Sequence, residues 1–442
     1  MSGATTERFR AFARRSHEVI VLSAVTGAIT GFAVAIFDRI VVDGLLDHLF
    51  ELSPWVLGFM PLVGLALAAL ALHFVARNDD PAMTDLYLRA FHDPEQPIRV
   101  REFPGRMLAA IATAGFGGAM GLEGGSLYMG SAFGSFLQRR FPRFTAGSSR
   151  RVLMVAGAAA GVAAIFKAPA TGAIFALESP YREDMGRRML LPALVSAASG
   201  YLVFVAINGT TPLFPAAGAP PIRFVDLVGA IALGIAAGLC ARGFAWLVLS
   251  AKSLITRFSP WVRVLGAGLT IAALFGITYQ LTDRPIAIGI GYGTLQWALS
   301  PSRAIWLLLV VLLVRCLATA ATVAGGGVGG LFIPLVVAGA LLGRTVGGVV
   351  GDHNLTLFVV IGVAAFLGAG YRVPLAAVMF VAETTGRPGF VVPGLLAAVA
   401  ASLVMGRASV TTYQRSTTGP DPSATGTGDD DDDATGANPT RE

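Results

Sequence analysis

The residue of this chain best placed to do chemistry is Glu123, which lies between Gly121 and the pair Gly124-Gly125, directly before an apolar stretch. A carboxylate inside a membrane costs about 2.5–3.5 kcal/mol, so it rarely lacks a role. At a helix N-terminus it faces unpaired N–H groups and the positive end of the helix dipole, which also bind small anions. An ionised carboxylate would occupy such an anion site, and a protonated one would vacate it. Glu123 is therefore a candidate for a proton-linked gate; a structural helix cap is the alternative.

The segment that contains Glu123 occurs a second time. Residues 121–130 can be laid over residues 330–339, and Phe332 then takes the position of Glu123. Apolar segments interrupted by glycine or proline, in corresponding positions of two halves, indicate a transport site near the middle of a bilayer. The backbone N–H groups around Phe332 are candidates to line this site, and ordinary packing is the alternative for Phe332.

A second pair of matching segments lies downstream, and each contains a proline and a glutamate nine residues apart. Pro169 is followed by Glu178, and Pro374 is followed by Glu383. We interpret all four residues as structural. The two glutamates are expected to satisfy backbone groups where broken helices meet, since such groups need partners in a membrane.

Basic residues gather between the apolar stretches, as in residues 8–15, 139–151 and 182–188. The positive-inside rule explains this pattern, and no basic stripe interleaved with aromatic residues indicates nucleic-acid binding. Lys167 and Arg372 precede the two prolines in matching positions. They either snorkel to a membrane surface or lie beside an aqueous vestibule that attracts anions.

The composition is that of an integral membrane protein surrounded by lipid. Hydrophobic residues make up 54% of the chain and charged residues 14%, and there are 54 glycines; a soluble domain has roughly 25% charged residues. Several apolar stretches are too short or too rich in glycine to be simple spans, which is typical of tilted and discontinuous helices. They lie at about residues 18–41, 54–76, 107–137, 152–179, 188–207, 223–250, 262–282, 303–323, 330–350, 355–383 and 390–406.

Composition also divides the chain. We expect a basic cytoplasmic lead (1–17), a first membrane repeat (18–220), a second membrane repeat (221–413) and a disordered acidic tail (414–442). The boundary between the repeats falls in a segment rich in Pro, Gly and Thr. A short helix is expected around residues 84–91, inside an otherwise polar interval.

Enzyme and cofactor signatures are missing from the sequence. The five histidines have no close metal-ligand spacing, and neither a P-loop nor a GxSxG motif occurs. We therefore predict no metal, no cofactor, no nucleic-acid partner and no enzymatic activity. A membrane-embedded enzyme or receptor is a remote alternative.

Together these motifs resemble the CLC family of chloride channels and chloride/proton antiporters, in the prokaryotic type without CBS domains. Residues 121–125 resemble the GxEGP motif, with Gly125 in place of proline, and residues 329–334 resemble GGxFxP. Residues 157–178 resemble the GAAAG…FxAP…E run, and residues 371–383 resemble the RxPL…E run. The likeness extends in order over about residues 18–410.

This resemblance implies an all-α integral membrane protein, in which two halves form an inverted repeat of tilted, broken and re-entrant helices. Each subunit would have its own anion pore, and two subunits would form a homodimer in the plasma (inner) membrane. Glu123 would be the external gating glutamate. The backbone amides expected to bind the anion belong to Gly121, Leu122, Glu123, Gly330, Leu331, Phe332 and Ile333.

The chain departs from the family pattern at two anion-binding segments. The serine motif should lie within residues 79–85, where Pro81, Ala82 or Met83 takes the place of the serine, and Met83 is our candidate. The central tyrosine should fall near the last helix, where Thr411 stands at its position and Tyr413 two residues later. Both are candidates for the anion site.

A third departure concerns protons. Many antiporters of the family carry an inner proton-transfer glutamate one residue after the position of Glu178, and this chain has Ser179 there. Glu183 and Asp184 lie nearby and could replace it, although solvated loop charges are the other interpretation of these two residues.

The sequence thus predicts transport of chloride or a related small anion through a pore gated by Glu123, as a channel or as an anion/proton antiporter. A fluoride/proton antiporter that exports fluoride is the alternative, because such family members also depart at the serine motif.

Overall fold

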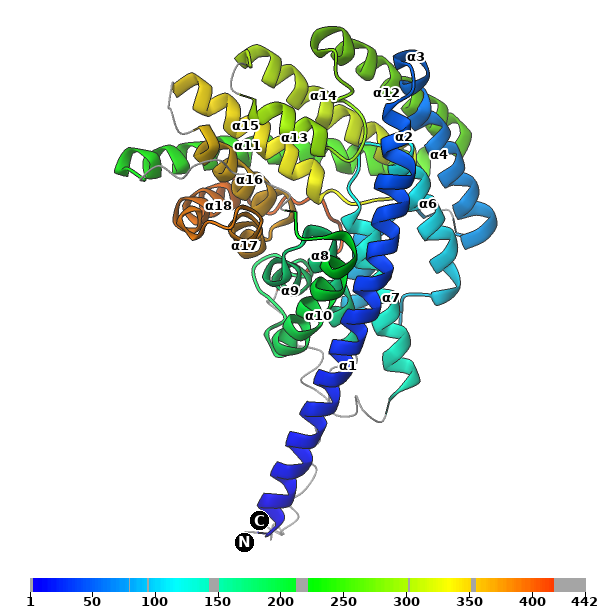
Figure 1. Ribbon diagram of the computed structural model, residues 1–442, viewed down its shortest axis with the longest axis vertical. Coiled ribbons are helices and arrows are strands. Elements are labelled where there is room, and N and C mark those ends of the chain that lie inside the picture. Colours follow the sequence, from blue (N-terminus) through cyan, green and yellow to red (C-terminus); the bar gives the residue numbers. More distant parts are fainter. Residues whose placement is uncertain are drawn as a thin grey trace, which may run out of the picture.

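The chain folds into a helical membrane protein in which helices from both halves surround a common centre (Figure 1). The computed structural model describes residues 3–78, 80–93, 95–142, 151–211, 222–300, 303–350 and 355–416. Nearly all of the predicted acidic tail, from residue 417 onward, lies outside the described residues, as does most of the segment predicted to separate the repeats. The predicted basic lead continues into the first helix, whose backbone is helical from Gly3.

Ten α-helices lie before the predicted boundary in the described part of the chain. They are α1 (Gly3–Val41), α2 (Asp47–Phe50), α3 (Pro54–Leu57), α4 (Met60–Leu70), α5 (Thr84–His92), α6 (Phe103–Gly115), α7 (Glu123–Arg140), α8 (Val152–Phe166), α9 (Pro169–Glu178) and α10 (Leu190–Asn208). The expected short helix is thus α5. Short π-helical turns extend α1 and α4.

Eight α-helices follow the boundary in the same described ranges. They are α11 (Phe224–Arg257), α12 (Pro260–Thr282), α13 (Tyr292–Leu299), α14 (Ile305–Ala324), α15 (Phe332–Val350), α16 (Leu355–Tyr371), α17 (Pro374–Thr385) and α18 (Val391–Met405). Helix α13 was missed by the sequence analysis, because it is too short to stand out as an apolar stretch.

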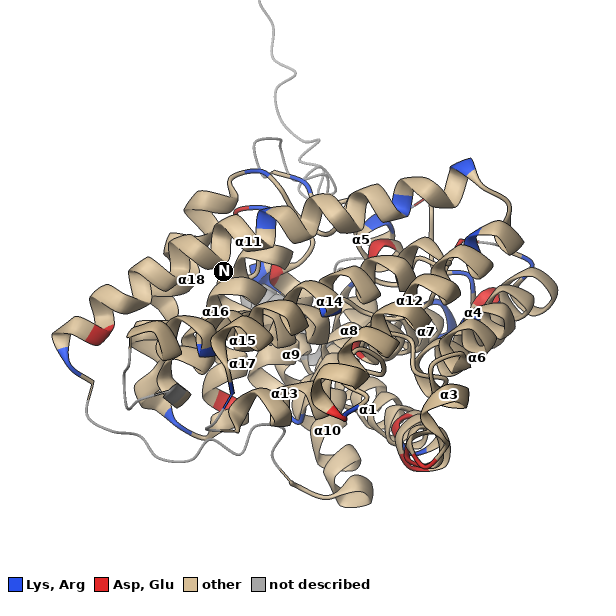
Figure 2. Ribbon diagram, turned by 90° about the horizontal axis from the view of Figure 1, so that it is seen from above, with Lys and Arg blue, Asp and Glu red and all other residues tan. Residues whose placement is uncertain are grey.

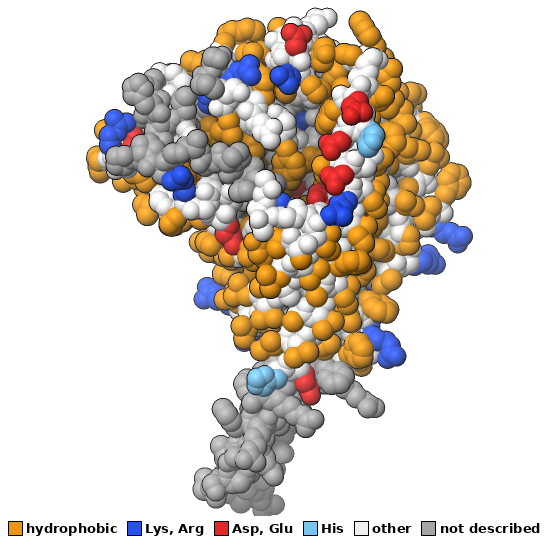
Figure 3. Space-filling model, in the orientation of Figure 1, with side chains coloured by type: hydrophobic (Ala, Val, Ile, Leu, Met, Phe, Trp, Pro, Cys, Tyr) orange, Lys and Arg blue, Asp and Glu red, His pale blue; other side chains and the backbone are white. Residues whose placement is uncertain are grey.

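Eight helical segments among the described residues are long and apolar enough to cross a membrane. Most of each ribbon carries neither an acid nor a base (Figure 2), and hydrophobic side chains cover much of the visible exterior (Figure 3). Since a water-soluble protein rarely exposes apolar patches of this extent, the chain is a multi-pass membrane protein. This confirms the predicted class.

Three of the predicted stretches are broken helices. The stretch at 107–137 divides into α6 and α7, and the stretches at 152–179 and 355–383 divide into α8 with α9 and α16 with α17. Pro169 and Pro374 are the first residues of α9 and α17, where proline is tolerated because that N–H has no helical partner. The residues that directly follow the preceding helices, Lys167 after α8 and Arg372 after α16, have positive φ angles of 53° and 59°. The repeated motif therefore gives the same break twice.

Glycine pairs bring helix backbones into direct contact at matching places in the two halves. Gly130 of α7 lies against Gly157 of α8, and Gly339 of α15 lies against Gly362 of α16; a Cβ at any of the four would overlap the facing carbonyl oxygen. Small residues allow this close approach in membrane proteins, where packing replaces the hydrophobic effect between helices. These crossings fix the direction in which the N-termini of α7 and α15 point.

Candidate functional site

The two repeat-related glycine loops meet at the centre of the protein. The N–H of Gly121 donates to the carbonyl of Gly330 (2.9 Å), and the N–H of Gly330 donates to the carbonyl of Gly121 (2.8 Å). This antiparallel bridge brings together the first residues of α7 and α15, Glu123 and Phe332. The N–H groups of the two glycines are thereby occupied, which differs from the prediction that they face an anion.

Glu123 points across this bridge to the other half. Its carboxylate is buried, at 2% exposure, and Oε1 accepts the N–H of Phe332 at 2.5 Å. The carboxylate also interacts with the N–H of Ile333, whereas Oε2 has no hydrogen-bond partner among the described residues. Gly330 leaves room for the carboxylate, because a Cβ there would overlap it. The carboxylate thus sits on backbone donors of the opposite helix.

A further polar group near this point is the hydroxyl of Tyr371, at the end of α16. Its hydroxyl accepts the N–H of Leu331 at 3.2 Å and interacts with the Thr84 side chain at the start of α5. The ring is fully buried. The sequence analysis quoted Tyr371 only as part of a motif. The repeat could have drawn attention to Tyr371: it matches Phe166 in the first half, so only the second half has a hydroxyl at this position.

The side chain of Phe332 has a separate role from its backbone. Its ring packs against Phe166 (4.3 Å between centroids), Phe380 (5.0 Å) and Phe175 (5.5 Å). The ring thus packs in an aromatic cluster while the N–H of Phe332 reaches Glu123, and a role of this N–H in binding an anion stays a prediction.

Glu178 and Glu383 each cap the start of a helix in the other half of the protein. Glu178 at the end of α9 accepts two N–H groups in the first turn of α17, at 2.9 and 3.2 Å. Glu383 in α17 accepts the N–H groups of Ala170 (2.9 Å) and Thr171 (2.7 Å) and the Thr171 hydroxyl (2.7 Å), all in the first turn of α9. The two broken helices are thus tied together in both directions, and this geometry agrees with a structural role for the glutamates.

We expect Glu383→Ala to lower the free energy of unfolding by about 2–3 kcal/mol, because three donors lose their acceptor at a partly buried helix start. Thermal or denaturant unfolding in detergent measures this, with the exposed Glu95→Ala as the control. A loss below about 0.5 kcal/mol would mean that water replaces the carboxylate, contrary to this expectation.

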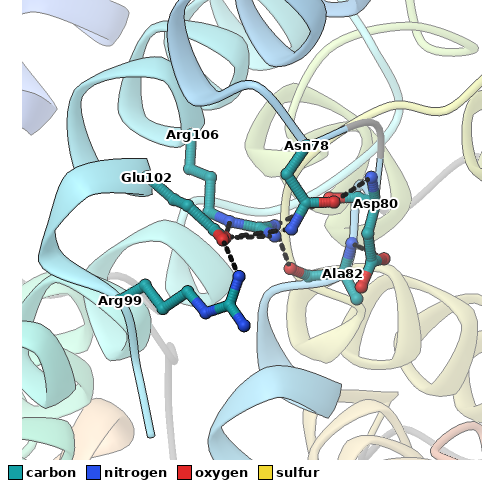
Figure 4. A network of polar contacts seen from close by, with 6 residues as sticks. All are labelled: Asn78, Asp80, Ala82, Arg99, Glu102 and Arg106. Atoms are coloured by element: carbon teal, nitrogen blue, oxygen red, sulfur yellow. Dashed lines mark hydrogen bonds and ion pairs between the residues drawn. The ribbon is translucent and has the colours of Figure 1, made fainter. Parts of the chain in front are cut away.

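The loop before α5 is held by a fully buried arginine (Figure 4). Arg106 donates to the Glu102 carboxylate through two nitrogens (3.0 and 3.1 Å) and to the carbonyls of Asp80 (2.7 Å) and Ala82 (2.9 Å). Asn78 also donates to Glu102 (3.0 Å). This network fixes the segment in which the serine motif was expected and places Met83, which is 2% exposed, directly before α5. Sequence analysis did not single out Arg106 or Glu102.

The two candidates in the C-terminal segment differ in position. Thr411 is buried and its hydroxyl bonds Ser409 (3.0 Å), whereas Tyr413 is 43% exposed with the Arg89 guanidinium over its ring. Tyr413 therefore does not join the buried group, although it was predicted with Thr411.

The candidates for an inner proton carrier are also separated. The Ser179 side chain is buried without a hydrogen-bond partner among the described residues. Glu183 lies 3.6 Å from Arg372 with its side chain 70% exposed, and Asp184 pairs with Arg187 at 3.5 Å. These two acids behave as solvated loop charges. In the part of the chain that the structure describes, no three acids, histidines or cysteines gather as a metal site.

A family profile and curated relatives of similar sequence agree on the family of this chain. A family profile described as "Voltage gated chloride channel" matches residues 63–406. The H(+)/Cl(-) exchange transporter ClcA of Salmonella arizonae is 26% identical over 412 residues, covering 87% of this chain and 85% of the relative. ClcA of Citrobacter koseri is 26% identical over 407 residues, with the same coverage.

Solved structures share the fold. A slow cyanobacterial Cl⁻/H⁺ antiporter superposes with a TM-score of 0.76 at 21% identity, covering 88% of this chain and 94% of the other. A CLC-type fluoride/proton antiporter superposes with a TM-score of 0.77 at 21% identity, covering 90% and 98%. At these identities the likeness concerns the fold alone.

Proposed function

Because the chain belongs to the voltage-gated chloride channel (CLC) family, we propose that it carries small monovalent anions across a membrane and that Glu123 gates their pathway. The relatives with the same coverage are named as exchange transporters rather than enzymes. We propose accordingly that anion movement is exchanged for protons. The two membrane halves, residues 18–220 and 221–413, would contribute one helix N-terminus each to the pathway.

A single observation carries this proposal: the Glu123 carboxylate occupies the N–H of Phe332 at the start of α15. A helix N-terminus that binds a carboxylate can also bind a halide. Protonation would neutralise Glu123, weaken its hold on the N–H group and let an anion take its place. Anion and proton would therefore compete through one group, which is the simplest form of coupling.

The anion site would combine backbone and hydroxyl donors. The N–H groups of Phe332 and Ile333 reach Glu123 from the start of α15, and the Tyr371 hydroxyl, which accepts the N–H of Leu331, would add its own O–H. Chloride is the first candidate anion because relatives are named for it. Fluoride is the second, and the observation that favours it is the missing serine hydroxyl within residues 79–85.

The assembly and location are part of the same proposal. We expect a homodimer in the plasma (inner) membrane, in which two apolar exteriors meet within the bilayer. Each subunit would keep its own pathway, because Glu123 and its donors all come from one chain. Cross-linking in native membranes, followed by electrophoresis, would test the dimer.

Halide efflux from proteoliposomes tests the function directly. Vesicles are loaded with chloride or fluoride, and the external halide concentration and pH are recorded together. Efflux accompanied by proton uptake supports exchange, and efflux without proton movement makes the protein a passive channel. If neither halide leaves faster than it does from protein-free vesicles loaded with the same halide, the anion-transport proposal is wrong.

Tyr371→Phe is expected to weaken halide binding by about tenfold, because one hydrogen bond to an anion is worth about 1.5 kcal/mol. Calorimetric titration of the detergent-solubilised protein measures the dissociation constant. Tyr128→Phe is the matched control, since the Tyr128 hydroxyl is buried with no partner among the described residues. Equal affinity of both variants and the unmodified protein would exclude the Tyr371 hydroxyl from the site.

A further inference from the structure

A cavity of about 220 Å³ lies where α4, α12 and the end of α14 meet, apart from the proposed anion site. Helices α4 and α12 run side by side there (Figure 1). The π-helical turn Ala71–Ala76, which extends α4, forms one wall, the first turn of α12 forms another, and Gly325 and Gly326 after α14 form a third. Among the described residues, those that line the cavity include none of the donors assigned to the anion.

The cavity lies at the cytoplasmic boundary of the membrane. The first two spans, His17–Phe50 and Pro54–Ala76, carry the chain out from the basic lead and back again. The wall made by the π-helical turn is the end of the second span, and Arg77 directly follows it. On the other side, α11 ends at Arg257 just before α12 begins. Arginines at the ends of spans mark the cytoplasmic side.

The rim of the cavity is apolar and faces the bilayer. Phe74 is 68% exposed, Trp261 55% and Leu70 36%, and all three line the cavity. Tryptophan is enriched where a membrane meets water, because its ring has an apolar body and a polar N–H. Since lipid covers the exterior of the spans, an acyl chain can reach the cavity from the side.

The interior of the cavity offers groups that bind a phosphate. The Arg263 guanidinium reaches the residues after α14, because a Cβ on Gly326 would lie 3.4 Å from its Nη1. A guanidinium presents five donors in a planar fork that matches a phosphate. Pro260 is the first residue of α12, so the cavity also touches a helix N-terminus, whose first N–H groups lack helical partners and favour an anion. His73 adds a ring nitrogen from the π-helical turn, a conformation frequent at functional sites.

We propose that this cavity binds an anionic glycerophospholipid of the cytoplasmic leaflet. Its phosphate would lie on Arg263 and the start of α12, and one acyl chain would leave past Phe74 and Trp261 into the bilayer. Basic pockets between membrane helices on the cytoplasmic side bind anionic lipid head groups in this way. Arg77 and Arg257 favour an anionic head group over a zwitterionic one. The proposal depends on the membrane location of the chain and not on the transport function.

A lipid in this cavity would support the loop that leads to the central site. A Cβ on Gly325 would overlap both Leu65 of α4 and Ala267 of α12, so the end of α14 fits closely between these helices. From there the chain continues to Gly330, which pairs with Gly121 beside Glu123. A phosphate bound to Arg263 would therefore join the three elements on which this loop rests, and we expect the lipid to stabilise the fold.

Lipid binding to the delipidated protein in detergent tests the proposal. Native mass spectrometry compares phosphatidylglycerol, phosphatidylcholine with the same acyl chains, and glycerol phosphate at equal concentration. We expect one phosphatidylglycerol to bind more tightly than phosphatidylcholine, and glycerol phosphate not to displace it. Arg263→Gln should weaken this binding about tenfold or more, because charge-assisted hydrogen bonds to the phosphate are lost. Arg188→Gln, an exposed arginine outside the cavity, is the matched control and should leave it unchanged.

Thermal unfolding in detergent gives a second measurement. Phosphatidylglycerol should raise the unfolding temperature of the unmodified protein and of Arg188→Gln, and should raise that of Arg263→Gln much less. If Arg263→Gln fails to fold, Trp261→Ala takes its place, because it removes the apolar rim and leaves the arginine. It must then also bind phosphatidylglycerol more weakly, and unchanged binding overturns the proposal.

Three other outcomes would also overturn the lipid site. Equal binding of phosphatidylglycerol to Arg263→Gln and Arg188→Gln would mean that Arg263 holds no lipid. Glycerol phosphate that binds as tightly as the lipid would make a soluble phosphate the ligand. A change in the number of protein copies with Trp261→Ala, with the lipid count unchanged, would mean that a second copy covers the cavity. None of these measurements involves transport, so failure of halide efflux remains a separate result.

Discussion

Replacing Glu123 by glutamine is expected to abolish proton movement while halide efflux continues and loses its dependence on pH. Glutamine has the size of the protonated acid but cannot titrate. The carboxylate of Glu123 accepts the N–H of Phe332 and is 2% exposed. After its replacement, this N–H no longer faces a negatively charged side chain. With a neutral side chain, the anion no longer competes with a carboxylate for the donors at the start of α15. Paired halide and pH recordings from proteoliposomes measure both fluxes at once.

The alternative role of Glu123 as a structural cap gives the opposite result. A cap would lose stability on conversion to glutamine, while any proton coupling carried elsewhere would persist. Glu95→Gln, an exposed acid, is the control for charge removal. If Glu123→Gln moves protons with the same ratio to halide as the unmodified protein, then Glu123 is not the gate.

Arg106→Met is expected to destabilise the protein by about 3 kcal/mol, because it removes the buried cation of Glu102 and leaves this carboxylate only the 73% exposed Arg99, at 3.7 Å. It also frees the carbonyls of Asp80 and Ala82, which Arg106 holds at 2.7 and 2.9 Å. The loop before Met83 would lose its fixed shape, so halide binding should weaken along with stability. Denaturation midpoints in detergent and calorimetric halide titration measure the two effects.

Two further variants separate charge from geometry. Removing both charges with Arg106→Met and Glu102→Leu should restore much of the lost stability, since a buried ion pair can often be replaced by apolar residues. Arg106→Lys keeps the charge but lacks the planar fork that reaches both the carboxylate and the two carbonyls. It should fold yet bind halide more weakly. Full halide affinity in the double variant would show that the network serves stability alone.

The class of the protein and its family could be predicted from local features. Apolar stretches gave the membrane helices, and the motifs around Glu123 and Phe332 gave the CLC family, which the family profile confirms. Broken helices were expected in general, but the breaks before Pro169 and Pro374 come from the structure, in which each proline is the first residue of its helix. These features depend on neighbours within a few residues.

The contacts that complete the site could not be predicted, because they join distant residues. Tyr371 reaches Leu331 across 40 residues, and Thr412 reaches Asp85 across 327. No local pattern marks which arginine will be buried, so Arg106 was missed. Tyr413 was chosen by its position in a motif, but the segment turns its ring toward the surface. Tertiary packing decided each of these cases.

The exchange of caps between Glu178 and Glu383 has a consequence for how the protein is made. The backbone N–H groups at the start of α9 are synthesised 212–213 residues before their acceptor in α17. At about 5–20 residues per second, roughly 10–40 s of translation separate the two. During that time the first half sits in the membrane with open donors at its centre. The nascent chain therefore reaches its final shape only after the ribosome has delivered α17, and a truncated message yields a half that cannot finish folding.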